Sequence, residues 1–180
     1  MKKIPLLLKR ENGVVTDQIN PQCRWVFRGL AIPTQKFDGT ACAIIDGELY
    51  KRYDAKLKDG KYKKPIPKNA ISCQPPDPIT GHHPHWVKCD RNNPADKWHW
   101  QAFDALDINI DGTYELCGEK VKGHKLIRHG AVILYGISTY PTLAQIKEFL
   151  RTHDVEGIVF YNTITGEMCK IRKKDFNFKR

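Results

Sequence analysis

The stretch TQKFDGTACAII, residues 34–45, places a lysine two residues before an aspartate and three before a glycine. Lys36, Asp38 and Gly39 form the pattern K-x-D-G, which leads into a run of small and apolar residues. A neutral lysine amine is a nucleophile, so the pattern raises the question of covalent chemistry at Lys36. Three fixed letters arise by chance in about one chain of this length in twenty, so support must come from elsewhere in the sequence.

The stretch VEGIVFYNTITGEMCKIRKK, residues 155–174, reads as a β-hairpin that carries an acid and two cations. With its turn centred near Ile164, position 156 lies opposite 172 and position 158 lies opposite 170, so Glu156 faces Arg172. Lys170 and Arg172 are two residues apart and share one face of their strand. An ordinary surface ion pair, worth about 0–1 kcal/mol, is the alternative interpretation of this group.

Together, Lys36 and this hairpin suggest polyphosphate chemistry. An ordinary lysine amine has a pKa of about 10.4, so only about one in 2,500 is neutral at pH 7. Neighbouring cations and a divalent metal lower such a pKa, and the same cations offset the charge of a transferring nucleotidyl group. Mg²⁺ binds one or two carboxylates together with phosphate oxygens, which makes Glu156 the expected metal ligand.

The elements that must position these residues are mostly strands. ACAIIDGELYKRYDAK, residues 41–56, is a hairpin with an Asp46-Gly47 turn, which places Lys36 just before a rigid strand. Residues 57–93 are rich in Lys, Pro, Gly and His and are expected to form a long surface loop. Residues 111–123 predict a turn and a strand, 125–139 one or two more strands, and 141–153 a helix opened by Pro141. We therefore expect an α+β antiparallel architecture in one domain over residues 1–180.

Composition limits the class of protein. The 180 residues are 41% hydrophobic and 28% charged, with a formal net charge of +10. This is typical of a soluble globular protein that attracts polyanions such as nucleic acid, although the charge also serves solubility. No stretch is long enough to span a bilayer, and no signal peptide is evident. The six cysteines include no CxxC pair, so we expect reduced thiols in a cytoplasmic protein.

The order of several segments resembles the covalent nucleotidyltransferase superfamily of ATP-dependent DNA and RNA ligases and mRNA-capping guanylyltransferases. RYDAK, QPPDPITGHHPHWV, DGTYELCGEKVKG and CKIRKKDF are most similar to the small stand-alone 5′–3′ RNA ligases, a family with a human member. The resemblance covers residues from about 24 to 178, and it implies antiparallel sheets that form a nucleotide cleft without an OB domain. The matching residues, in order, are Lys36-x-Asp38-Gly39, Arg52, Glu115 in YELCG, Glu156 in EGIVF, and Lys170 with Arg172 in KIR.

The resemblance implies a role for each matched residue. Lys36 would attack the α-phosphate of ATP, expel pyrophosphate and hold AMP through a phosphoramide bond. AMP would pass to an RNA 5′-phosphate, and an RNA 3′-hydroxyl would then displace it. Asp38 and Gly39 would shape the turn after Lys36, and Arg52 would contact the nucleotide and later the RNA 5′-phosphate. Glu115 would bind the ribose hydroxyls, and Glu156 would bind Mg²⁺ or Mn²⁺. Lys170 and Arg172 would bind the α-phosphate.

Two positions leave alternatives open. Arg172 stands where RNA ligases usually have lysine, and Arg172→Lys is tolerated if the residue is only a phosphate clamp. Tyr135 is the candidate to stack on the adenine, and the alternative is a tyrosine packed in the core of a strand.

Other features receive a weaker interpretation. A zinc site in residues 73–89 would match no standard ligand spacing. Tryptophans between apolar segments favour core packing over stacking on bases. The basic C-terminus could contact RNA or be a solvated end. The candidate zinc ligands are Cys73, His82, His83, His85 and Cys89, and the tryptophans are Trp86, Trp98 and Trp100. The basic C-terminal residues are Lys173, Lys174, Lys179 and Arg180.

We therefore expect a monomeric, ATP-dependent RNA ligase of RNA repair that joins 5′-phosphate and 3′-hydroxyl ends and has no membrane partner. The alternatives are a minimal DNA ligase, a capping-type guanylyltransferase, and a non-catalytic basic RNA-binding module of the same fold.

Overall fold

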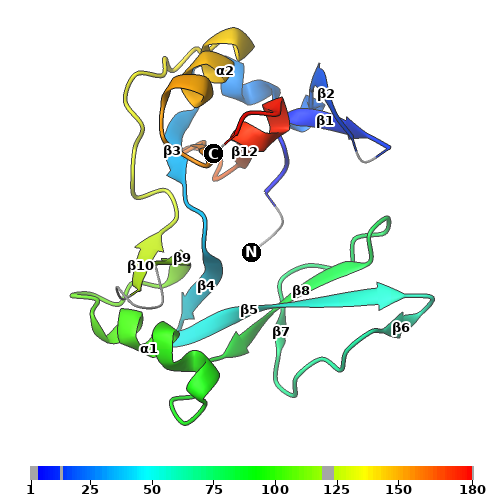
Figure 1. The fold of residues 1–180 in the computed structure, drawn as a ribbon, viewed down its shortest axis with the longest axis vertical. Helices are drawn as coiled ribbons and strands as arrows, with labels where there is room; N and C mark the ends of the chain where they lie inside the picture. Colours follow the sequence, from blue (N-terminus) through cyan, green and yellow to red (C-terminus); the bar gives the residue numbers. More distant parts are fainter. Residues whose placement is uncertain (1–3, 13, 119–123, 180) are drawn as a thin grey trace. The chain divides into compact units, whose positions relative to one another are not determined.

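The computed structural model describes residues 4–12, 14–118 and 124–179. The chain divides into two compact units. One is Asp38–His129, called here the 38–129 unit; the other combines Ile4–Phe37 with Gly130–Arg180 and is called the split unit. Both are α+β with open, mainly antiparallel sheets, which confirms the expected class (Figure 1). The expectation of one nucleotidyltransferase domain stays a prediction.

The split unit is built on a three-stranded antiparallel sheet in the order β12-β11-β3. Its strands are β3 (Ile32–Lys36), β11 (Gly157–Tyr161) and β12 (Met168–Arg172). The hairpin predicted over residues 155–174 is therefore confirmed, with β11 and β12 as its arms. The unit also contains β1 (Leu8–Glu11), β2 (Val14–Ile19) and the 3-10 segments η1 (Pro21–Phe27) and η3 (Lys173–Phe176).

Helix α2 (Leu143–Thr152) belongs to the same unit and confirms a helix in the predicted range 141–153, but Thr142 is its N-cap, so Pro141 lies before the helix and does not open it. The Thr142 hydroxyl accepts a hydrogen bond from the Gln145 N–H, and the Gln145 side chain accepts one from the Thr142 N–H. This capping box fixes the start of the helix. The helix buries Ile146, Phe149 and Leu150 in a core that also contains Ile158, Phe160 and Ile171 of the sheet. Side chains alternate along strands, and these buried residues cover one face of the sheet. Residues 36, 170 and 172 therefore project from the opposite face.

The 38–129 unit contains a seven-stranded sheet with the order β10-β9-β4-β5-β8-β7 and with β6 on β5. Helix α1 (Lys97–Asp104) and the short η2 (Pro94–Asp96) lie between β8 and β9 in the chain. Cys42, Ile44, Leu49, Tyr114 and Leu116 share its core with Ala102 and Phe103 of α1. The strands are β4 (Thr40–Ile45), β5 (Glu48–Lys58), β6 (Lys61–Tyr62), β7 (Ile71–Ser72), β8 (His82–Lys88), β9 (Gly112–Cys117) and β10 (Lys125–Arg128).

The β4–β5 hairpin confirms the Asp46-Gly47 turn. Both residues have positive φ, 52° and 74°, as a two-residue hairpin turn of the favoured twist requires. The Asp111 carboxylate accepts hydrogen bonds from the N–H groups of Asp46 and Gly47, at 2.8 and 3.0 Å. A distant acid therefore fixes the turn that leads out of β4.

One expectation about the middle of the chain was wrong, and another was confirmed. Residues 57–93 are not one long loop, because β8 pairs with β5 from His82 to Lys88. Pro84 and three histidines hide this strand in the sequence, since neither residue type favours an internal strand. Residues 125–139 supply one strand, β10, and Ile133 forms only an isolated bridge to Thr34.

The strand predicted within residues 111–123 is β9. Residues 119–123 of that segment lie outside the described part of the chain. Neither helix of the described residues has the length and apolar character needed to cross a bilayer. All six cysteines are free thiols.

Candidate active site

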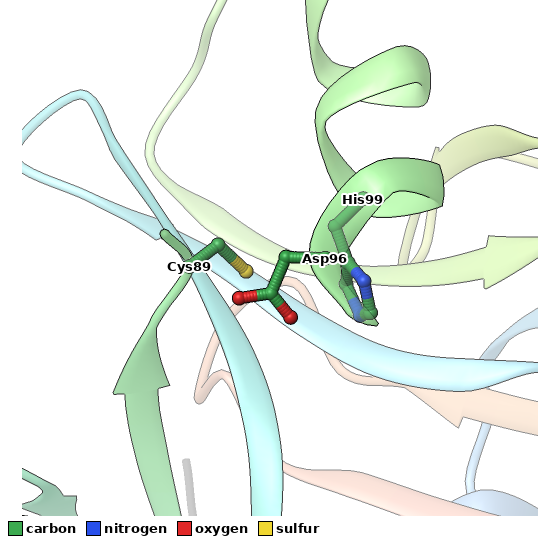
Figure 2. A group of neighbouring side chains, drawn as sticks. All are labelled: Cys89, Asp96 and His99. Atoms are coloured by element: carbon green, nitrogen blue, oxygen red, sulfur yellow. The ribbon is translucent and has the colours of Figure 1, made fainter. Parts of the chain in front are cut away.

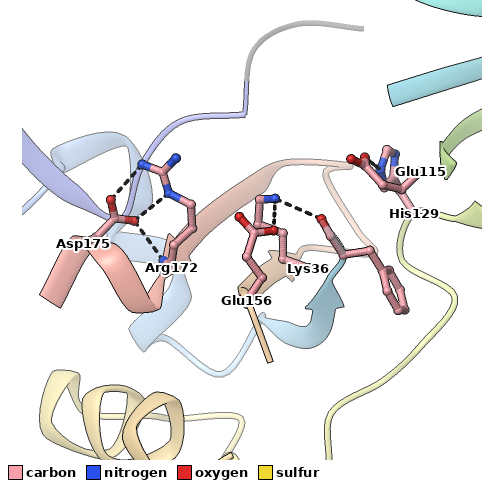
Figure 3. Close-up of polar contacts among 7 residues, drawn as sticks. Lys36, Glu115, His129, Glu156, Arg172 and Asp175 are labelled. Carbon is pink, nitrogen blue, oxygen red and sulfur yellow. Dashed lines mark hydrogen bonds and ion pairs between the residues drawn. The ribbon is translucent and has the colours of Figure 1, made fainter. Parts of the chain in front are cut away.

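Lys36 is the last residue of β3, and its amine has two oxygen partners in the split unit. Lys36 Nζ lies 2.5 Å from Glu156 Oε2 and 3.1 Å from the Phe37 carbonyl oxygen (Figure 3). The two side chains are partly buried, with exposed fractions of 22% and 11%. The Glu156 carbonyl accepts a bond from the Lys173 N–H at 3.0 Å, which fixes the backbone beside the carboxylate.

Lys36 and Arg172 flank a glycine in one row of the sheet. Gly157 pairs with Lys36 on one side and with Arg172 on the other. Partners across antiparallel strands point to the same face, so both cations project from the face opposite the core. A Cβ added to Gly157 would lie 2.4 Å from the Ile171 carbonyl oxygen and 3.0 Å from the Arg172 Cα. Only glycine therefore fits here, and the row has no side chain between its two cations.

The register of this hairpin differs by one residue from the predicted one. Gly157, not Glu156, lies opposite Arg172, and Val159 lies opposite Lys170. The predicted turn centre was half a residue too early, which moved each partner by one. Lys170 and Arg172 do share one face, because they alternate with buried Cys169 and Ile171.

Arg172 is held by an acid that the sequence argument missed. Its Nε and Nη2 donate to the Asp175 carboxylate at 3.0 and 2.7 Å, and its backbone N–H adds a third bond at 2.9 Å (Figure 3). The Asp175 side chain is only 2% exposed. A bidentate arginine–carboxylate pair fixes the plane of the guanidinium, so Arg172 has a defined orientation. Asp175 follows Arg172 by three residues in η3, and no motif identified it.

In the 38–129 unit, Glu115 lies on β9 and bonds to His129. His129 Nε2 is 3.0 Å from Glu115 Oε2 (Figure 3). His129 Nδ1 is 2.9 Å from the Thr113 hydroxyl. The side chains of Glu115 and His129 are 14% and 23% exposed. His129 therefore orients the Glu115 carboxylate. This role could not be predicted from the sequence, where His129 belongs to no motif.

Arg52 shares a face of the sheet with Glu115. Ala41 of β4 pairs with Glu115 of β9. Cys42 pairs with Lys51 of β5, so the antiparallel register continues with Arg52 beside Ala41. An alanine thus stands between the predicted ribose ligand and the predicted phosphate ligand, as Gly157 stands between two cations of the split unit. Arg52 Nε donates to Asp54 Oδ1 at 2.8 Å.

Gly39 lies against β9 in the same unit. A Cβ at this position would lie 2.2 Å from the Leu116 carbonyl oxygen and 3.1 Å from Cγ of Glu115. The glycine of K-x-D-G is therefore required by close approach of its backbone to the strand that carries Glu115. Asp38 begins this unit, two residues after Lys36.

Tyr135 lies outside the strands, and its side chain is 86% exposed. The alternative of a core tyrosine in a strand is therefore wrong. The role on adenine stays a prediction.

Three weaker expectations can also be compared with the structure. In the described part of the chain, residues 73–85 do not gather with Cys89 as metal ligands. His83 instead bonds to Tyr62 and Ser72, at 2.5 and 2.8 Å. Trp86 is buried, and Trp98 and Trp100 pack against the core, as expected. Of the basic C-terminus, Lys173 is buried, Lys174 and Lys179 are exposed, and Arg180 lies outside the described residues.

No protein-family model matches this chain, and no curated protein sequence matches it at a significant level. We therefore infer a function from the order of the motifs and from the geometry of their residues.

Proposed function

We propose that the chain is an ATP-dependent RNA ligase that joins 5′-phosphate and 3′-hydroxyl ends through a lysyl-AMP intermediate. The observation that carries the proposal is the surroundings of Lys36. Its amine contacts the carboxylate of Glu156, and one row of the sheet connects Lys36 through Gly157 to Arg172. A nucleophile, an acid and an oriented guanidinium on one small sheet are the groups that transfer of a nucleotidyl group needs.

Glu156 is suited to prepare Lys36 for attack. The Glu156 carboxylate forms an ion pair with the Lys36 amine. A Mg²⁺ ion that binds ATP phosphates would compete for the same carboxylate and place positive charge near the amine. The ammonium group would then lose its proton to water, and the neutral amine would attack the α-phosphorus. A P–N bond forms, the bond to pyrophosphate breaks, and AMP stays on Lys36.

Arg172 and Lys170 supply charge for this step. Asp175 offsets the net charge of Arg172 but fixes its N–H groups, so this residue contributes direction as much as charge. Lys170 lies on the same face of β12 and adds a point charge. These cations match a phosphate group that gains negative charge as the bond to pyrophosphate breaks.

The resemblance assigns Glu115 to the ribose and Arg52 to phosphate, first of the nucleotide and then of the RNA. Their row supports that assignment, because Ala41 leaves space between them on the face away from α1. Asp38 and Gly39 shape the chain after the nucleophile, and Tyr135 offers an exposed ring for the adenine. The net charge of +10 supports a polyanionic second substrate.

A sealing assay tests the proposal. Purified protein is incubated with ATP, Mg²⁺ and RNA that carries a 5′-phosphate and a 3′-hydroxyl, either nicked or single-stranded. We expect adenylylated RNA followed by joined RNA, and neither product from Lys36→Met. DNA strands and GTP, run in parallel, separate a DNA ligase and a capping enzyme from an RNA ligase. RNA binding without any covalent product would favour the non-catalytic module.

A further inference from the structure

A second group of chemically active side chains lies in the 38–129 unit and has no part in the proposed ligase reaction. One ligand atom each of Cys89, Asp96 and His99 lies within 4.8 Å of the other two. Figure 2 shows the thiol, the carboxylate and the imidazole directed toward one another. Two of the three residues, Cys89 and Asp96, are buried.

Rigid elements hold this group. Cys89 follows β8 directly, and its N–H donates to the Leu49 carbonyl at 2.9 Å. Asp96 is the N-cap of α1, and His99 is in the first turn of that helix. Residues three apart on a helix lie on the same side, so Asp96 and His99 approach Cys89 together.

Two outer partners orient the Asp96 carboxylate. Lys51 Nζ forms an ion pair with Oδ1, and the Asp90 N–H donates to Oδ2 at 3.0 Å. A carboxylate oxygen has two lone pairs, so both oxygens keep the capacity to bind a cation. Carboxylates that bind metals are commonly fixed by such outer hydrogen bonds.

His99 gives an independent indication of a ligand. Both of its ring nitrogens are buried, and neither has a hydrogen-bond partner among the described residues. Native proteins rarely leave buried polar atoms in this state. A neutral imidazole nitrogen is a common metal ligand in proteins.

We propose that Cys89, Asp96 and His99 bind a zinc ion. A set of one sulfur, one nitrogen and one carboxylate oxygen suits Zn²⁺ and not Mg²⁺, which prefers oxygen ligands alone. Zinc bonds of about 2.0–2.3 Å place ligand atoms about 3.3–3.8 Å apart, so these side chains would need to close by at most about 1.5 Å. The ion would tie the end of β8 to the start of α1.

Metal titration of the full chain tests this site independently of any ligase activity. Protein freed of metal by a chelator is titrated with Co²⁺ and, in a separate experiment, with Zn²⁺. We expect one ion per chain, a thiolate–cobalt absorption band, and a higher midpoint of thermal unfolding with Zn²⁺. Cys89→Ser should abolish the absorption band.

His99→Gln is the decisive variant. The ring nitrogens of His99 have no hydrogen bond to lose among the described residues, so this change removes a ligand without breaking a hydrogen bond there. We expect at least a tenfold weaker Zn²⁺ affinity and no zinc-dependent rise in the unfolding midpoint. Cys73→Ser is the matched control and should bind zinc as the unchanged chain does. No metal uptake, or full affinity in His99→Gln, would overturn the proposal.

Discussion

At Glu156, one carboxylate has to serve two partners in turn. It bonds to Lys36 in the structure, and in the proposed reaction it would bind Mg²⁺. Glu156→Ala should therefore lower the rate of lysyl-AMP formation by about 10²-fold or more, because both the metal ligand and the partner of Lys36 are removed. Stopped reactions with labelled ATP measure this rate.

The control for this change is Glu167→Gln. Glu167 belongs to the same hairpin, and its carboxylate accepts a hydrogen bond from the Thr165 hydroxyl in the turn region. It should form the adduct at the normal rate. An unchanged rate in a folded Glu156→Ala protein would contradict the role given to Glu156.

Arg172 and Asp175 make a prediction about geometry. Arg172→Lys keeps the charge but cannot keep the two-pronged contact with the Asp175 carboxylate. We expect adduct formation to fall by about tenfold, and stability to fall by about 1–3 kcal/mol because a buried carboxylate loses partners. Asp175→Asn should lower the rate while Arg172 remains present. Normal rates in both variants would reduce Arg172 to a simple phosphate clamp.

At the scale of elements, Gly157 links the fold to the chemistry. Gly157→Ala forces a Cβ against the backbone of β12, so the strand that carries Lys170 and Arg172 must shift. Such overpacking costs about 1–3 kcal/mol, and we expect both the free energy of unfolding in urea and the adduct rate to fall.

Gly166→Ala provides the comparison in the same hairpin. Its φ is +72°, and no atom lies within 4 Å of the added Cβ. It should cost about 1 kcal/mol and leave the adduct rate unchanged. Equal loss of activity in both variants would mean that stability, and not the position of β12, limits the reaction.

The elements also show what the sequence could predict. The Asp46-Gly47 hairpin and α2 were predictable because local signals, a turn dipeptide and a capped periodic segment, agree with the tertiary structure. Strand β8 was not, because Pro84 and the histidines conceal it and its pairing with β5 is not local. Lys170 and Arg172 followed from the alternation of one strand. Asp175 and His129 did not, because their contacts depend on the turn after β12 and on the β9–β10 pairing.

For the whole molecule, the net charge of +10 predicts RNA binding that weakens with salt. Lys174 and Lys179 are the exposed lysines near the C-terminus, whereas Lys173 is buried. If both contact RNA phosphates, replacing them with alanine should reduce the slope of log K against log salt by about 1.4 for a single strand. Fluorescence anisotropy at several salt concentrations measures this slope.

Lys63 and Lys64 form the control pair, since both are exposed in the 38–129 unit. An equal change of slope from this pair would mean that the effect reports total charge. A slope unaffected by Lys174 and Lys179 would make the basic C-terminus a solvated end.

The central claim is that Lys36 becomes covalently bound to AMP. Intact-mass spectrometry of the protein after incubation with ATP and Mg²⁺, followed by peptide mapping, tests it most directly. We expect one added adenylyl group, located on Lys36, dependent on the metal and absent from Lys36→Met. An unmodified chain under these conditions, or AMP attached to another residue, would contradict it.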